Sequence, residues 1–393
     1  MVFGSSAARA AIAEQRVAML FRLALALVAM AAVSTLGWLA IAPNRLLPGV
    51  ARPAYEILGT AAYALAACAL ISALAAGQGR RLAWLGMILA AAGLLAAPIL
   101  TGWRAGELVA GRPIARATFG AGFWLATACL LLLALEAARA TGSAAARPLL
   151  ALMIVGGAAA AAAAGWFAPL SLAVEYRSRA DALERAFAEH LALAGGALLL
   201  AIVIAVPLGW VAFRVPRVES SIAGTFNAIQ VTPALAMFGL LVSALSLILA
   251  AAPGLRAYGI SAIGVAPALI AVAAYLTLPL FRSTLTGLSS VSPAAVESAR
   301  AMGMTEARVT REVRVPLGLP IFIGGLRVAA VQAIGLTTLG GLIGAGGLGS
   351  IVFAGMSQFA EDLIVLGAAP IVGLAILVDA VMRAISQRME AIA

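Results

Sequence analysis

The chain has 393 residues, of which 64% are hydrophobic and only 11% are charged, and its mean hydropathy is +1.07. A soluble protein of this length could not bury so much apolar surface, so the composition excludes that class and predicts an integral membrane protein. The apolar runs are about 20 residues long, as in membrane-spanning helices, whereas barrel strands have only about 10. The sequence therefore predicts an all-α polytopic membrane protein.

Ten apolar runs predict ten transmembrane helices. With the N-terminus inside, 17 of the 26 arginines fall on the cytoplasmic side, and the positive-inside rule then places both termini in the cytoplasm. The predicted spans, in chain order, are 20–41, 57–77, 82–101, 118–138, 149–169, 190–213, 231–252, 261–281, 320–343 and 363–386.

The composition of the runs changes near residue 175. Residues 1–175 hold five Ala- and Leu-rich spans with few polar groups, which predicts an accessory membrane domain. Residues 176–393 hold five spans with more Gly, Pro, Thr and Gln, which predicts the working core. Polar or aromatic residues next to prolines in this core either line a transport path or form hydrogen bonds between helices. Both interpretations apply to Gln230, Thr232, Pro233, Tyr275, Thr277 and Pro279.

All the basic residues are arginines. A P-loop requires a lysine, so this chain cannot hold its own P-loop, and we expect it to bind no cofactor. The net charge of +10 does not indicate nucleic-acid binding, because the arginines are spread along short loops, where they set membrane orientation. No HExxH, GxSxG or His–acid cluster is present, so neither a metal site nor an enzymatic activity is expected. The lone His190 is interpreted as a structural or interfacial residue rather than as a pH sensor.

One long charged stretch, at residues 289–320, interrupts the apolar core. Ser292 and Pro293 predict the start of a short helix and Gly303 its end. Thr305 predicts the cap of a second helix, and Pro316 its end. Four arginines against three glutamates between residues 297 and 314 give a weak attraction for anionic lipid, so the pattern favours docking to another protein.

Within this stretch Glu297-Ser298-Ala299 is followed by Gly303 and then by Val313 to Pro316. This spacing resembles the EAA loop of the membrane subunits of bacterial ABC importers, with Ser298 in place of Ala and Val315 in place of Leu. The resemblance implies a coupling helix that inserts into a separate ATPase subunit. The docking residues that it implies are Glu297, Ser298, Ala299, Met302, Gly303, Val313 and Pro316.

The wider core contains the segments "HLALAGGALLLAIVIAVPLG", "NAIQVTPALAMFGLL", "IGAGGLG" and "GLAILVDAVM". In these segments it is similar to permeases of osmoprotectant importers for glycine betaine, choline or carnitine. The N-terminal spans resemble the extension of the longer, Yeh-type permeases in length and layout. The family implies a five-helix MetI-like core, a second permease half, an ATPase subunit dimer that uses ATP and Mg²⁺, and an extracytoplasmic solute-binding protein at the bacterial inner membrane.

Other functions stay open at this point. The cargo could be another small solute, such as methionine or proline, and the first five spans could serve a sensor or assembly factor. An ion-coupled secondary transporter would need ionisable residues deep in the membrane, where the sequence offers little besides Asp379. Arg383 lies one turn after Asp379, so a helix-end salt bridge is the favoured interpretation of that acid.

Overall fold

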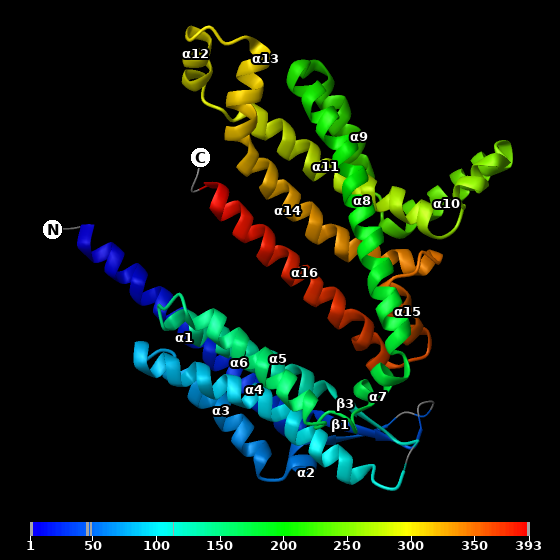
Figure 1. Cartoon of the computed structure of the whole chain (residues 1–393). Coiled ribbons are helices and arrows are strands. Elements are labelled where there is room, and N and C mark those ends of the chain that lie inside the picture. The colour runs from blue at the N-terminus through cyan, green and yellow to red at the C-terminus, as the bar shows by residue number, and fades with distance from the viewer. Residues whose placement is uncertain (1–2, 45–46, 48, 113, 391–393) are drawn as a thin grey trace. The chain divides into compact units, whose positions relative to one another are not determined.

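The computed structural model describes residues 3–44, 47, 49–112 and 114–390, with side chains from residue 13 to residue 389. The chain divides into two compact units, Met1–Ser178 and Arg179–Ala393 (Figure 1). The two ends of the chain, which the sequence assigns to the cytoplasm, lie outside the described residues.

Among the described residues, nine helices are long and apolar enough to cross a membrane. Five of them lie in the second unit, as the resemblance implies, and four lie in the first. The predicted polytopic helical class is confirmed. The predicted span at 57–77 is the exception, because its helix, Ala61–Ala75, has only 15 residues. Crossing a bilayer core takes about 20 residues.

The first unit combines helices with a small sheet. Its elements are α1 (Phe3–Thr35), β1 (Gly37–Ala42), β2 (Val50–Pro53), α2 (Ala54–Leu58), α3 (Ala61–Ala75), α4 (Arg80–Leu108), β3 (Arg116–Phe119), α5 (Ala121–Ala140), α6 (Ala146–Ala163) and α7 (Ser171–Ser178). Along α3, α4 and α5 the buried positions are mostly alanines and glycines, which let these helices approach closely.

The sheet corrects the sequence prediction, which extended spans across residues 37–41 and 118–119. The strand order is β2-β1-β3, all antiparallel, and Ala40 of β1 pairs with both Ala51 and Thr118. Trp38 is fully buried, and its indole N–H donates to Thr101 Oγ1 at 2.8 Å. Hydropathy along a short apolar run cannot distinguish the end of a helix from a buried strand, so only the pairing partners reveal β1.

The second unit is built from helices. Its main helices are α8 (Ala180–Arg214), α9 (Glu219–Val231), α10 (Ala234–Ala251), α11 (Val265–Ser289), α12 (Pro293–Ala301), α13 (Glu306–Val309), α14 (Val315–Gly340), α15 (Leu348–Ser357) and α16 (Glu361–Glu390). Short 3-10 turns lie at Pro216–Val218, Pro253–Tyr258 and Gly341–Ile343, and a π-helical turn lies at Thr310–Arg314.

Helix α11 is the centre of the second unit and packs against both α8 and α14. Leu276, Leu280 and Phe281 of α11 are almost completely buried, and alanines of α8 such as Ala201 and Ala205 form part of the same core. Figure 1 shows α10 extending to one side, where it meets α11 but leaves most of its own apolar surface exposed.

Candidate functional site: the loop between α11 and α14

The loop at residues 289–320 starts as its sequence predicts. The Ser292 hydroxyl accepts a hydrogen bond from the Ala295 N–H at 3.3 Å, and Pro293 occupies the first turn of α12. In Figure 1, α12 and α13 project beyond the ends of α11 and α14. The chain thus leaves the helical core, turns sharply and returns within about 25 residues.

Gly303 makes the turn between α12 and α13, as predicted. Its φ of +84° is in the left-handed region, which residues with a side chain adopt only at a cost. The Met304 N–H bonds Ala299 O at 3.2 Å and the Gly303 N–H bonds Arg300 O at 2.9 Å, which is the Schellman pattern of helix ends. Thr305 then caps α13 by accepting a hydrogen bond from the Arg308 N–H.

An ion pair closes the same turn from outside. Arg300 Nε lies 2.6 Å from Glu306 Oε1, and this carboxylate raises the pKa of the Arg300 guanidinium. A second pair, Arg308 with Glu312, follows at an i, i+4 spacing on the helix. Both pairs are solvent-exposed, so they help to hold the shape of the loop but add little to stability.

The loop has a small core of its own. Val296, Ala299 and Val309 are almost completely buried together, and Met304 and Val313 pack against them. Because these contacts join α12 to the start of the returning helix, the loop is a folded element rather than a flexible connection.

The small core divides the predicted docking residues into two groups. Ala299 is buried and Val313 is half-buried against the small core, so both help to shape the loop. Glu297, Ser298 and Gly303 are exposed. Met302 is 72% exposed, because it caps the helix at the end of its buried face, which Val296 and Ala299 form.

The prediction that Pro316 ends the second helix is wrong. The π-helical turn at Thr310–Arg314 follows α13 directly and leads into α14, with Pro316 in the first turn of that helix. In the π turn the Val315 N–H bonds Thr310 O, five residues back. Proline lacks an N–H and crowds the preceding turn, and the wider turn just before Pro316 lets the helix continue past this site.

Arg314 fastens the loop to the helical core. Its Nη1 donates to Leu288 O at 3.0 Å, near the end of α11, and its guanidinium lies over the Phe213 ring of α8 at 5.1 Å. A displacement of the loop therefore acts on α8, α11 and α14 together.

The structure brings three of the predicted path-lining residues into one hydrogen-bonded cluster. Gln230 Nε2 donates to Tyr275 O at 2.9 Å, and the Tyr275 hydroxyl donates to Thr232 O. Pro279 explains the first bond, because it lies four residues after Tyr275 in α11 and cannot donate to that carbonyl. The Gln230 side chain supplies the missing donor and joins the break between α9 and α10 to the middle of α11.

The other predicted path-lining residues differ in exposure. Pro233 is exposed at the α9–α10 break, and Pro279 is half-buried in α11. Thr277 is fully buried and its hydroxyl bonds Ala273 O within the same helix, so in this conformation Thr277 lines no open surface.

Asp379 of α16 pairs with two arginines. It contacts Arg383 in its own helix, as predicted, and also Arg327 of α14 at 2.6 Å. The sequence pattern alone does not reveal the role of Arg327, which lies twelve residues inside α14. An arginine inside an apolar run needs a buried acid or water as its partner. The signal in the sequence that could have indicated this pair is Asp379, an acid inside another apolar run.

His190 is fully buried and packs against the glycine turn before α15. Its Nε2 lies 3.1 Å from Ile334 O, and the neighbouring Glu189 accepts a hydrogen bond from the Gly347 N–H at 2.9 Å. Gly344, Gly346 and Gly347 have positive φ, so the "IGAGGLG" segment is a tight turn between helices. These contacts give His190 a structural role.

Two protein families match this chain. Residues 15–173 match "ABC transporter permease YehY, N-terminal domain", and residues 197–391 match "Binding-protein-dependent transport system inner membrane component". The chain is 34% identical over 200 residues to the choline transport system permease protein OpuBB of Bacillus subtilis, covering 51% of this chain and 84% of the relative. It is 38% identical over 191 residues to the osmoprotectant import permease protein OsmW of Salmonella typhimurium, covering 49% and 84%.

Among solved structures, a methionine ABC transporter, MetNI, in an inward-facing conformation aligns with 51% of this chain and 93% of its own, at 19% identity and a TM-score of 0.45. The assignment rests on the sequence matches and on the five spans of the second unit. The chain belongs to the family of binding-protein-dependent transport system inner membrane components, the ABC importer permeases, and carries a YehY-type N-terminal domain.

Proposed function

We propose that the chain is the membrane-spanning permease subunit of an ATP-driven importer for osmoprotectants such as glycine betaine or related quaternary amines. The observation that carries the coupling role is the folded loop at 289–320, which presents Glu297, Ser298 and Met302 outward and is continuous with α14. The relatives named as permease proteins of choline and of glycine betaine/carnitine/choline transport systems support this cargo.

The proposed mechanism starts at a partner, because this chain has no lysine for a P-loop. ATP and Mg²⁺ close a dimer of ATPase subunits, and α12, seated in a cleft of one of them, follows that closure. The small core of the loop keeps α12 and α13 together, and Arg314 and the continuous helix pass the movement to α11 and α14. Paired with a second permease half in the inner membrane, these helices alternately open a path to an extracytoplasmic binding protein and to the cytoplasm.

The docking step is tested by binding and hydrolysis with the ATPase encoded beside this gene. Glu297→Ala and Met302→Ser should each weaken ATPase binding by roughly 10-fold or more, as substitutions at the centre of an interface do. Glu184→Ala, an equally exposed acid near the opposite end of α8, serves as the matched control. Wild-type affinity and full solute-stimulated hydrolysis in both loop variants would refute docking at this loop.

The cargo is tested separately by calorimetry of the partner binding protein with betaines, choline, carnitine, proline and methionine. Tight binding of methionine or proline alone would replace the osmoprotectant cargo and leave the permease role intact. Solute import that continues after deletion of the ATPase gene would instead favour an ion-coupled carrier.

The role of the first unit is tested by uptake after deletion of residues 1–170. We expect transport to persist, because the five spans of the second unit make up the family's permease core. Complete loss of uptake by a correctly inserted deletion variant would contradict an accessory role.

A further inference from the structure

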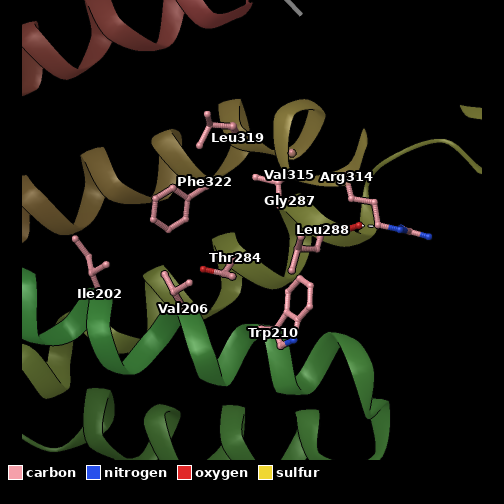
Figure 2. A pocket seen from close by; sticks show the side chains of 11 residues that line it. Ile202, Val206, Trp210, Thr284, Gly287, Leu288, Arg314, Val315, Leu319 and Phe322 are labelled. Carbon is pink, nitrogen blue, oxygen red and sulfur yellow. Dashed lines mark hydrogen bonds between the residues drawn. The ribbon is translucent and has the colours of Figure 1, made fainter. Parts of the chain in front are cut away.

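A groove runs along the second unit next to the loop, between α8 and α14, with α11 as its floor (Figure 2). Its volume is about 370 Å³, within the range of small-molecule sites. The walls are apolar: Ile202 and Val206 come from α8, and Leu319 and Phe322 come from α14. On each helix these side chains are spaced by three or four residues, so they form one continuous face.

Glycines explain the floor. A Cβ on Gly318 of α14 would lie 2.2 Å from Gly287 O of α11, so these two backbones touch where the helices cross. On α8, a Cβ on Gly209 would lie 2.8 Å from Thr284 Cβ. The close crossings remove side chains from the floor, and the groove forms above it, where larger residues of α8 and α14 stand on either side.

The two ends of the groove differ. Figure 2 shows Trp210 and Arg314 at one end, and Ile202 and Phe322 toward the other. Arg214 lies over the Trp210 ring at 4.9 Å, so a second guanidinium stands beside the same end. This is the end from which the loop leaves the helices, where a membrane interface would place tryptophan and arginine.

Only part of the charge at this end is neutralised. Arg314 uses one N–H on Leu288 O, and an arginine carries five N–H donors. Glu306 interacts electrostatically with both Arg314 and Arg214, but its carboxylate is already paired with Arg300. Two guanidinium groups therefore face the interface at the mouth of an apolar groove.

We propose that this groove binds an anionic phospholipid of the leaflet that adjoins the loop, with one acyl chain between α8 and α14 and its phosphate at Arg214 and Arg314. An apolar groove alone would select no lipid, because hydrocarbon surrounds the helices on all sides, so the headgroup charge supplies the preference. The proposed cargo carries a quaternary ammonium group and has no long acyl chain, so an apolar groove that ends in two guanidinium groups fits it poorly. A bound lipid would hold the end of the loop at Arg314 in place against α8.

Trp210 provides the measurement. The full chain is reconstituted in nanodiscs that contain brominated phosphatidylglycerol or brominated phosphatidylcholine at equal mole fractions, and Trp210→Phe isolates the fluorescence of this residue. Phosphatidylglycerol should reach half-maximal quenching of Trp210 at a lower mole fraction than phosphatidylcholine. The difference should be about five-fold for each of the two arginines. Arg214→Gln and Arg314→Gln should each remove about five-fold of this preference. Arg217→Gln, an exposed arginine outside the groove, should leave it unchanged.

A second pair of variants tests the groove itself. Val206→Phe fills it and should reduce quenching by phosphatidylglycerol, whereas Val203→Phe, on an exposed face of α8, should not. The two valine variants keep both arginines. A folding failure of Arg314→Gln therefore leaves this second test intact.

Three results would overturn the proposal. Equal quenching by the two lipids would remove the charge preference, and an equal loss in Arg217→Gln would assign it to general surface charge. Loss of quenching by both lipids once the ATPase and the second permease half are bound would show that a protein covers the groove.

Discussion

Replacement of Gly303 by alanine tests whether the turn between α12 and α13 is held by its backbone conformation. No atom lies within 4 Å of the position that a Cβ would take, so the substitution causes no clash. Its cost is the left-handed conformation at φ +84°, about 1–2 kcal/mol for a residue with a side chain. That cost should increase the open population of the turn by roughly 5- to 30-fold.

Native-state hydrogen exchange measures this change directly. The amide protons of Gly303 and Met304, which close the helix end, should exchange faster by that factor in Gly303→Ala, and less so in Gly303→Asn, because asparagine tolerates this conformation better. Gly259→Ala is the matched control: its φ is +77°, it also has nothing within 4 Å, and it lies before α11 rather than in the loop. Unchanged exchange at the turn in Gly303→Ala would refute the reasoning.

Three further predictions concern the helices of the second unit, with thermal stability in detergent as the assay. Gln230→Leu leaves the carbonyl freed by Pro279 without a donor and should cost about 1–3 kcal/mol; Pro279→Ala restores a backbone donor, so the double variant should recover most of the loss, and equal losses in both backgrounds would contradict this account. Gly318→Ala forces α11 and α14 apart and should cost about 1–3 kcal/mol, whereas Gly324→Ala in the same helix, with open space at its Cβ, should be neutral; similar effects of the two would exclude a close crossing. Asp379→Asn leaves two arginines uncompensated and should destabilise the protein. Additional substitution of Arg383, the arginine in the same helix, should restore part of the loss. No change in thermal stability in Asp379→Asn would mean that water already compensates these charges.

The loop at 289–320 shows which structural features local sequence patterns can predict and which they cannot. Capping by Ser292 and Thr305 and the turn at Gly303 depend on residues within five positions of each other, so the pattern predicts them correctly. Pro316 marks where this reasoning fails. A proline normally ends a helix, but the π turn before it lets the chain continue into α14, and the sequence carries no sign of that turn.

Only the tertiary structure shows which residues of the loop face outward and which face inward. Glu297 and Ala299 are two residues apart in the same motif, yet one is exposed and the other is buried under Val309 and its neighbours. The motif indicates that both matter for coupling. The three-dimensional contacts separate the side chain that can meet a partner from the one that keeps the loop folded.

The sequence by itself determined the membrane class, most of the spans and the chemical limits of the chain, because hydropathy and the absence of lysine are properties of composition and local order. The tertiary structure decided what depends on partners far along the chain. Strand β1, the pair of Arg327 with Asp379 and the groove over the crossing of Gly287 and Gly318 all join residues separated by 30 or more positions. Apolar runs of equal hydropathy do not encode which helices meet, so packing alone creates these sites.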